Sequence, residues 1–171
     1  MNVSTVDTKV DLLAEVLSCY KPHCRYLKDL TVDGHRAEGR FAIPESCYID
    51  DTGHLNAVEV NICYNQLLYA LIATSVRDGT GPVFDTWTMA EVWRRRLPDI
   101  LIARFSSEFR KPIDARSFAG ELVFDRIVAR RLRPDAPPFV SIDTRFRFWD
   151  TDGGESSGAA RIAIVDGASH G

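Results

Sequence analysis

The spacing of hydrophobic residues changes along the chain. The N-terminal half contains segments with the period of an α-helix, and the C-terminal half alternates between apolar and polar residues. Between residues 7 and 19, apolar side chains including Leu13 and Leu17 recur at helical spacing, and Asp7 stands where a helix N-cap would lie. Pro22 follows and would interrupt a helix, because proline has no backbone N–H to donate. This pattern predicts a helix over about 7–19.

The next segments predict a hairpin followed by a loop. Residues 25–43 alternate loosely between apolar and polar positions, and they are interrupted at Asp33-Gly34, a dipeptide typical of tight hairpin turns. Residues 44–53 then gather turn-forming side chains, with four of them in succession at the end. We therefore expect a β-hairpin and a long loop before residue 54.

The most distinctive segment is 56–76, whose length corresponds to about six helical turns. Apolar residues occupy nearly every side of this helix, as in a helix buried at the centre of a fold. A buried amide or carboxylate must be bonded or used, because leaving it unpaired is costly. The polar residues of the segment fall on two stripes, Asn56–Glu59–Gln66 and the i, i+4 pair Asn61–Asn65.

A second helix is expected over 88–97, with Trp87 and Trp93 as packing aromatics and Pro98 after it. The period then changes to two, which is typical of strands with one covered face. Turn residues separate these strands, so we expect a four-stranded meander. The alternating segments are 101–110, 117–132, 138–150 and 158–166.

One long helix wrapped by an antiparallel β-sheet is the order of elements in the α+β hot-dog fold. The chain has 171 residues, 45% of them hydrophobic and 26% charged, which suits a single domain over residues 1–171. The last residues, 166–171, are expected to form a flexible tail.

Charge and hydropathy narrow the possible partners. A net charge of −3 argues against a nucleic-acid partner, which usually requires a basic surface. The N-terminus lacks the pattern of a signal peptide, and no apolar stretch is long enough to cross a bilayer. We therefore expect a cytoplasmic protein that does not contact a membrane.

The four cysteines have two interpretations. Cys19 and Cys24 lie five positions apart beside His23, which suggests a metal site, but the spacing is wide and no second matching pair follows. The simpler interpretation is a set of four free, mostly buried thiols, with Cys47 and Cys63 completing the set, in a reducing compartment. We expect no metal.

Candidate chemistry gathers in residues 45–59, just before and inside the start of the predicted central helix. A helix N-terminus offers unpaired N–H groups and a positive dipole end, which stabilise an oxygen that gains negative charge. Gly53 would allow close backbone approach. His54 can act as a general base or acid, because its ordinary pKa lies near neutrality; alternatively it caps the turn or binds a backbone carbonyl.

Glu59 is the second candidate catalytic residue. It can accept a proton, or it can close a capping box with Asn56, or it can be a solvated charge in the first turn. Tyr48 and Tyr20 are candidate substrate-binding residues, with half-buried packing as the alternative for both. Asn65 is included with them as a candidate substrate-binding amide.

Cations near this candidate site would matter for an acidic substrate. If Phe105 and Phe109 point inward, Arg104 and Arg110 share the opposite face of their strand. These arginines and Lys111 could bind a carboxylate or a phosphate, whereas the alternative is a solvated strand edge.

Two further basic groups could meet an acidic carrier protein or could simply be solvated. They are Arg94 to Arg96, and Arg130, Arg131 and Arg133.

Three blocks resemble the FcoT family of hot-dog proteins: ESCYIDDTGHLNAVEVNICYNQLLYA, SSEFRKP and FWDTDGGESSG. The resemblance extends from about residue 13 to 165. It implies an enzyme without cofactors, either a long-chain fatty acyl-CoA thioesterase or a relative that adds glycine to an α,β-unsaturated acyl carrier protein thioester in isonitrile lipopeptide and β-amino acid pathways. It also implies that Tyr20, Tyr48 and Asn56 are acyl-site residues. A homodimer with its site at the interface, able to form a hexamer, is implied as well.

Three functions follow from the residues and the resemblance together. The first is Michael addition of glycine to a (2E)-enoyl thioester on an acyl carrier protein, which thioester hydrolysis can follow. In it, His54 or Glu59 takes the amine proton, and Arg104, Arg110 or Lys111 binds the glycine carboxylate. The second is plain thioester hydrolysis, and the third is acyl binding without turnover.

Overall fold

The computed structural model describes residues 12–131, 133–136 and 138–165. Six antiparallel strands form one sheet, in the order β1-β2-β4-β5-β6-β3. The strands are β1 (Leu27–Asp33), β2 (Arg36–Phe41), β3 (Ile100–Lys111), β4 (Phe118–Arg130), β5 (Phe139–Trp149) and β6 (Glu155–Ile164).

The helices lie on one side of this sheet. Residues 12–17 are helical, so the described part of the predicted 7–19 helix agrees with it, whereas residues 7–11 and the predicted tail at 166–171 lie outside the described residues. The other helices are η1 (Pro22–Cys24), α2 (Ala57–Arg77), η2 (Phe84–Thr86) and α3 (Met89–Arg95).

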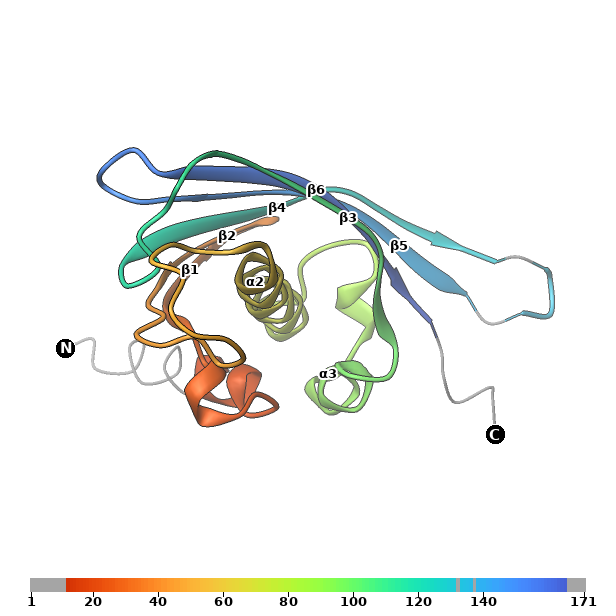
Figure 1. The fold of residues 1–171 in the computed structure, drawn as a ribbon. Helices are drawn as coiled ribbons and strands as arrows, with labels where there is room; N and C mark the ends of the chain where they lie inside the picture. The colour runs from red at the N-terminus through yellow and green to blue at the C-terminus, as the bar shows by residue number, and fades with distance from the viewer. Residues whose placement is uncertain (1–11, 132, 137, 166–171) are drawn as a thin grey trace.

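The sheet curves around α2, and α3 and the N-terminal segment flank the side of α2 away from the sheet (Figure 1). This is the predicted hot-dog arrangement. Asn56 is the N-cap of α2, and Thr88 is the N-cap of α3, so both helices begin where the sequence pattern placed them. The expected hairpin is also present, because β1 and β2 pair across a turn in which Gly34 has φ +55°.

The predicted four-stranded meander is wrong in one respect. β4, β5 and β6 are consecutive neighbours, but β3 pairs with β6 at the far edge rather than with β4. The connection 112–117 therefore crosses the ends of two strands. Three inter-strand spacings amount to about 14 Å, and six extended residues reach about 20 Å, so this connection is long enough. Alternation defines the faces of a strand but not its neighbour, which is why the pattern could not reveal this crossing.

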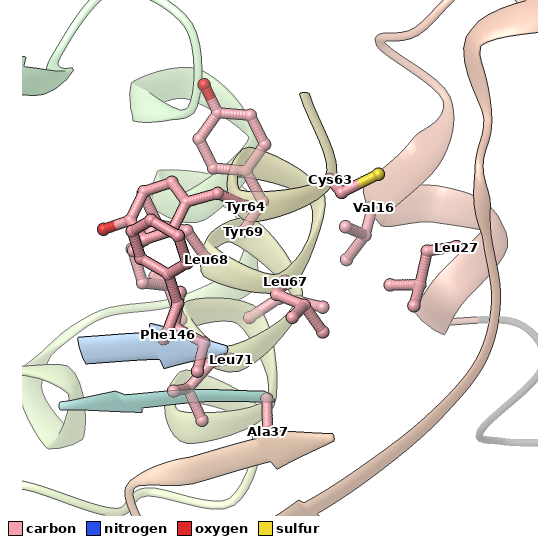
Figure 2. Packing of buried hydrophobic residues seen from close by; sticks show 14 of the residues in the cluster. Val16, Leu27, Ala37, Cys63, Tyr64, Leu67, Leu68, Tyr69, Leu71 and Phe146 are labelled. Atoms are coloured by element: carbon pink, nitrogen blue, oxygen red, sulfur yellow. The ribbon is translucent and has the colours of Figure 1, made fainter. Parts of the chain in front are cut away.

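The centre of α2 is packed on all sides. Figure 2 shows leucines and tyrosines of α2, with Val16 of the N-terminal helix and Leu27 at the start of β1 lying on one side of them. Tyr64 contacts Phe146 edge-on at 5.1 Å between ring centroids, and its hydroxyl lies 2.7 Å from Oγ1 of Thr144. The helix is therefore joined to β5 by ring packing and by a buried hydrogen bond.

Gln66 joins α2 to the start of β1. Its side chain is fully buried, and Oε1 accepts the backbone N–H of Tyr26 at 3.0 Å and of Leu27 at 2.9 Å. Its Nε2 donates to the carbonyl of Cys24 at 2.6 Å. The buried amide predicted from the polar stripe is thus bonded through both its oxygen and its nitrogen, and its partners are backbone groups.

None of the described helices is both long enough and apolar enough to span a bilayer.

Replacing Gln66 should destabilise the fold strongly. We expect Gln66→Met to lower the free energy of unfolding by about 2–4 kcal/mol, because it leaves two buried N–H groups and a carbonyl without partners. Asn65→Ala is the matched control, since Asn65 bonds only to Asn61 within the helix and should cost less than about 1 kcal/mol. Urea unfolding monitored by circular dichroism measures both; equal losses would contradict the role given to Gln66.

Candidate active site

The start of α2 is held by a capping box. Oδ1 of Asn56 accepts the N–H of Val58 at 3.0 Å and of Glu59 at 3.1 Å, while Oε2 of Glu59 accepts the N–H of Asn56 at 3.1 Å. The structural alternative raised for Glu59 is therefore present. It fixes the carboxylate in the first turn of a buried helix.

The capping box also limits what this helix start can offer a ligand. Three of its four non-helical N–H groups are occupied, and Ala57 N–H is the one without an acceptor among the described residues. The expected row of unpaired N–H groups is thus reduced to one. Nδ2 of Asn56 adds a second donor, because it is buried and has no hydrogen-bond partner within the described part of the chain.

Tyr48 completes the environment of Asn56. Its hydroxyl donates to Oδ1 of Asn56 at 2.8 Å, although half of the Tyr48 residue is exposed (50%). Three donors now converge on this oxygen, which fixes the orientation of the amide. Desolvation, and then the nearby Glu59 carboxylate, raise the pKa of Tyr48, so its hydroxyl stays protonated at neutral pH.

A pocket of about 280 Å³ opens beside the helix start. Two segments far apart in sequence form it, the loop before α2 and the connection between β3 and β4. Backbone bonds join them, from Leu55 N–H to the carbonyl of Ile113 at 2.9 Å and from Ile43 N–H to the carbonyl of Ala115 at 2.8 Å. The lining residues are Ile43, Pro44, Glu45, Ser46, Asp51, Thr52, Gly53, His54, Glu59, Asp114, Ala115 and Arg116.

Glu59 presents one free oxygen in this pocket. The residue is 2% exposed and Oε2 is used in the capping box. The structure shows no hydrogen bond to Oε1 from any residue it describes, and Glu59 lines the pocket. A buried carboxylate oxygen with an open side is suited to accept a proton from a bound amine or water.

His54 lines the same pocket from its exposed side. Its Nδ1 lies 3.1 Å from the carbonyl of Leu55, which can only accept, so the bond requires the proton on Nδ1. Nε2 then carries the lone pair in the neutral ring. The backbone-carbonyl contact raised as an alternative is therefore present, and it leaves the other nitrogen available. Gly53, before it, has φ +75°, a conformation that favours glycine.

Comparison with known proteins shows which family the chain belongs to. The sequence profile of the FcoT-like thioesterase domain matches residues 15–164. The chain belongs to this family. It is 56% identical to a (2E)-enoyl-[ACP] glycyltransferase of Streptomyces coeruleorubidus, over 91% of this chain and 96% of the relative. It is 36% identical to a protein of the same name from Mycobacterium tuberculosis (strain ATCC 25618 / H37Rv), over 95% and 90%.

Solved structures agree on the fold. A protein from Syntrophus aciditrophicus SB superposes with a TM-score of 0.58 at 11% identity, covering 93% of this chain and 97% of that one. A thioesterase family protein from Silicibacter pomeroyi has a TM-score of 0.52 at 12% identity, covering 92% and 99%. At such identities the likeness shows the hot-dog fold of the FcoT-like chain and nothing further.

The structure gathers five of the ten predicted site residues of this FcoT-like chain at the helix start. Gly53, His54 and Glu59 line the pocket, and Tyr48 and Asn56 are hydrogen-bonded to each other beside it.

Two predicted substrate-binding residues lie away from the pocket: Asn65 is in the middle of α2, and Tyr20 packs against α2. Tyr20 packs on Tyr69, with 6.4 Å between ring centroids, and burial raises its pKa. Asn65 donates to the side chain of Asn61 at 3.1 Å, as the i, i+4 spacing indicated. Neither residue lines the 280 Å³ pocket. Tyr20 thus behaves as the packing alternative described, whereas Tyr48 is exposed.

The three predicted cations are not brought to the pocket within this chain. Arg110 lies 3.6 Å from the carboxylate of Glu155, and Lys111 donates to the carbonyl of Asp152 at 2.5 Å. Arg104 is exposed opposite Arg161 in the register of β3 and β6. The register of β3 is regular between Phe105 and Phe109, so the two rings lie on the same face, as assumed. Phe105 packs against the core, whereas Phe109, near the end of the strand, is 41% exposed.

The sequence analysis did not identify Arg116. The structure places this arginine in the lining of the pocket. In the predicted meander, Arg116 falls between two alternating segments and belongs to no candidate site. The signal that could have found it is the length of the 112–117 connection, which exceeds that of a tight hairpin loop.

The first basic group, Arg94 to Arg96, has structural partners. Arg95 stacks over Trp87 at 4.7 Å, and Arg96 donates to the carbonyls of Glu15 and Val16 at 2.8 and 2.9 Å. The bonds of Arg96 attach the end of α3 to the N-terminal helix, and Arg95 packs α3 against Trp87 at the end of η2. The second group, Arg130, Arg131 and Arg133, is exposed on the projecting hairpin of β4 and β5 (Figure 1).

The cysteines of this FcoT-like chain are all free thiols. Cys63 is fully buried, and burial raises its pKa well above the ordinary value. Cys19, Cys24 and Cys47 are only half-buried, so the expectation that most of the thiols are buried is wrong. In the part of the chain that the structure describes, no three His, Cys, Asp or Glu side chains are placed to hold a metal ion.

The cap at Asn56 makes a prediction about stability. Asn56→Ala should lower the free energy of unfolding by about 1 kcal/mol, since it removes the acceptor for two N–H groups. Asn56→Asp should stay within about 0.5 kcal/mol of the parent, because aspartate caps helices as well as asparagine does. Thermal unfolding of the three proteins measures this, and an alanine variant as stable as the parent would show that the cap is not needed.

Proposed function

We propose that this chain adds glycine to the β-carbon of a (2E)-enoyl thioester carried by an acyl carrier protein. The observation that carries the proposal is the 56% identity, over nearly the whole chain, to a relative named (2E)-enoyl-[ACP] glycyltransferase. The more distant relatives share that name, which favours this reaction over the long-chain acyl-CoA thioesterase alternative. The pocket at the start of α2 supplies groups that suit this chemistry.

Addition begins with the glycine nitrogen, which must lose a proton to become a nucleophile. Glu59 is assigned this role because its Oε1 accepts no hydrogen bond from the residues that the structure describes, and its Oε2 is fixed by the capping box. The amine then attacks the β-carbon, and the electron pair of the double bond moves toward the thioester carbonyl. A proton held by a fixed carboxylate need not diffuse away before the second step.

The enolate that forms must be stabilised and then protonated on its α-carbon. Nδ2 of Asn56 is a buried donor with no partner among the described residues, and Ala57 N–H is a neighbouring free donor. Donors aimed at an oxygen that gains charge typically make the largest single contribution to catalysis. Glu59 returns the proton that it took from the amine to the α-carbon, which restores its carboxylate. The neutral ring of His54, whose Nε2 is unprotonated, can accept a proton but cannot supply this one.

Thioester hydrolysis would use the same groups with water in place of glycine. It can follow addition in one active site, because the thioester oxygen would occupy the same position. A non-catalytic acyl binder would need neither a free Glu59 oxygen nor an unpartnered amide donor. Turnover therefore distinguishes an enzyme from a non-catalytic acyl binder, and the dependence of turnover on glycine distinguishes glycine addition from plain thioester hydrolysis.

A homodimer is part of the proposal. β3 is 12 residues long and forms an edge of the sheet, where Leu101 and Phe109 are 45% and 41% exposed. A long, partly apolar edge is a template for pairing with another strand, and a second copy supplies one. The hexamer stays a prediction, as does the cytoplasmic location.

The acyl carrier protein is proposed to dock through the exposed arginines of the β4–β5 hairpin. Carrier docking of this kind depends on charge, so raising the ionic strength should slow the reaction of the carrier-bound substrate more than that of a free pantetheine thioester.

Mass spectrometry of a (2E)-enoyl thioester incubated with the protein tests the function directly. We expect a thioester heavier by one glycine, formed only when glycine is present. Free acid released at one rate with and without glycine would support the thioesterase alternative, and an unchanged substrate would support the acyl binder.

Glu59→Gln tests the proton acceptor without removing the cap. Glutamine closes a capping box as glutamate does, so the fold should be kept while the rate of addition falls about 10²- to 10⁴-fold. The rate is measured by single turnover, with unfolding free energy as the control. His54→Gln should reduce the rate less; the opposite order would assign the base to His54.

A further inference from the structure

We propose that Arg116 binds the carboxylate of the amino acid substrate, and that the pocket at the start of α2 is a site for a zwitterion. The inference rests on the proposed function and specifies how glycine is held in that site. Its first support is the charge of the lining, where one guanidinium stands among several carboxylates, Glu45, Asp51, Glu59 and Asp114.

The backbone of Arg116 is held firmly although it lies in a connection. Its N–H donates to Oδ1 of Asp114 at 2.9 Å, and the N–H of Asp114 donates to the carboxylate of Asp150 at 2.8 Å. That carboxylate also accepts the N–H groups of Asp152 and Gly154, and these bonds lower the pKa of Asp150. Arg116 therefore projects from a fixed point rather than from a loose loop.

The guanidinium itself is only lightly engaged. Its contact is Nη2 to Oδ2 of Asp51 at 3.5 Å, at the limit of hydrogen bonding, and its side chain is 73% exposed. A guanidinium has five N–H donors in a planar fork, so most of them remain for a ligand. Asp51 is itself fixed, because its Oδ1 accepts the N–H of Gly53 at 2.8 Å.

A carboxylate is the ligand that this fork matches best, because two parallel N–H donors meet its two oxygens. The surrounding carboxylates would repel a simple anion, but they favour a ligand that also carries an ammonium group. An α-amino acid has both charges on adjacent groups. Bound by Arg116 through its carboxylate, glycine would present its nitrogen to the carboxylate side of the pocket, which includes Glu59.

The arginines of β3 offer weaker candidates. Arg110 has the same exposure as Arg116 (73%), but its near partner is Glu155, and it does not line the pocket. It is therefore the natural rival in a test, matched in residue type and in exposure. Arg145, on the outer face of the sheet and bonded to Asp125 at 2.7 Å, serves as the neutral control.

The test compares glycine with glycinamide, which keeps the amine but lacks the negative carboxylate. The parent should prefer glycine, and Arg116→Gln should lower kcat/KM for glycine about 10- to 100-fold, the range expected when a charge-assisted hydrogen bond is lost. The loss should fall mainly on KM for glycine, with kcat/KM for glycinamide nearly unchanged. Arg116→Lys should recover part of the loss, whereas Arg145→Gln should behave as the parent.

Three results would overturn the assignment to Arg116, and a fourth would overturn the proposed function. If Arg116→Gln keeps the parent's preference for glycine, or if Arg110→Gln abolishes that preference instead, the assignment to Arg116 is overturned. If Arg116→Gln slows both amines equally, its role is structural and the proposal fails. If the parent adds neither amine to the enoyl thioester, the proposed function itself has failed, and this result is visible before any variant is made.

Discussion

The structure depends on how the start of a buried helix is satisfied. α2 is 21 residues long and buried along most of its length, so the polar groups at its first turn cannot all be left to water. Asn56 and Glu59 satisfy three of them reciprocally. The same bonds hold the Glu59 carboxylate in a pocket, and they leave Nδ2 of Asn56 without a partner among the described residues. The contacts that cap the helix therefore also position the groups of the candidate site.

The pocket is completed by a crossing that the strand pattern conceals. Because β3 pairs with β6, the 112–117 connection runs across the end of the sheet and is bonded to both ends of the loop that precedes α2. This route brings Asp114 and Arg116 to residues about sixty positions earlier in the chain. The incorrect meander and the missed Arg116 therefore have one cause, a choice of strand partner that local periodicity does not encode.

Much of the rest could be predicted because it depends on local chemistry. The extent of α2, its cap, the Asn61–Asn65 pair and the hairpin turn at Gly34 each follow from residues within a few positions of one another. Gln66 was predicted to be a buried amide, but its partners at the start of β1 and just before it lie some forty residues away, so only the structure could name them. Arg104, Arg110 and Lys111 were predicted from their charge and from the face of their strand, and neither of these determines which end of the sheet lies beside the pocket.

We propose that glycine is bound and activated at the start of α2. The decisive measurement is a crystal structure of the protein with glycine and a saturated acyl-pantetheine thioester, which cannot accept the amine. We expect the glycine carboxylate on Arg116, its nitrogen within hydrogen-bond reach of Glu59, and the thioester oxygen on Nδ2 of Asn56. Glycine bound at Arg104 or Arg110, or a thioester placed away from Asn56, would contradict the account.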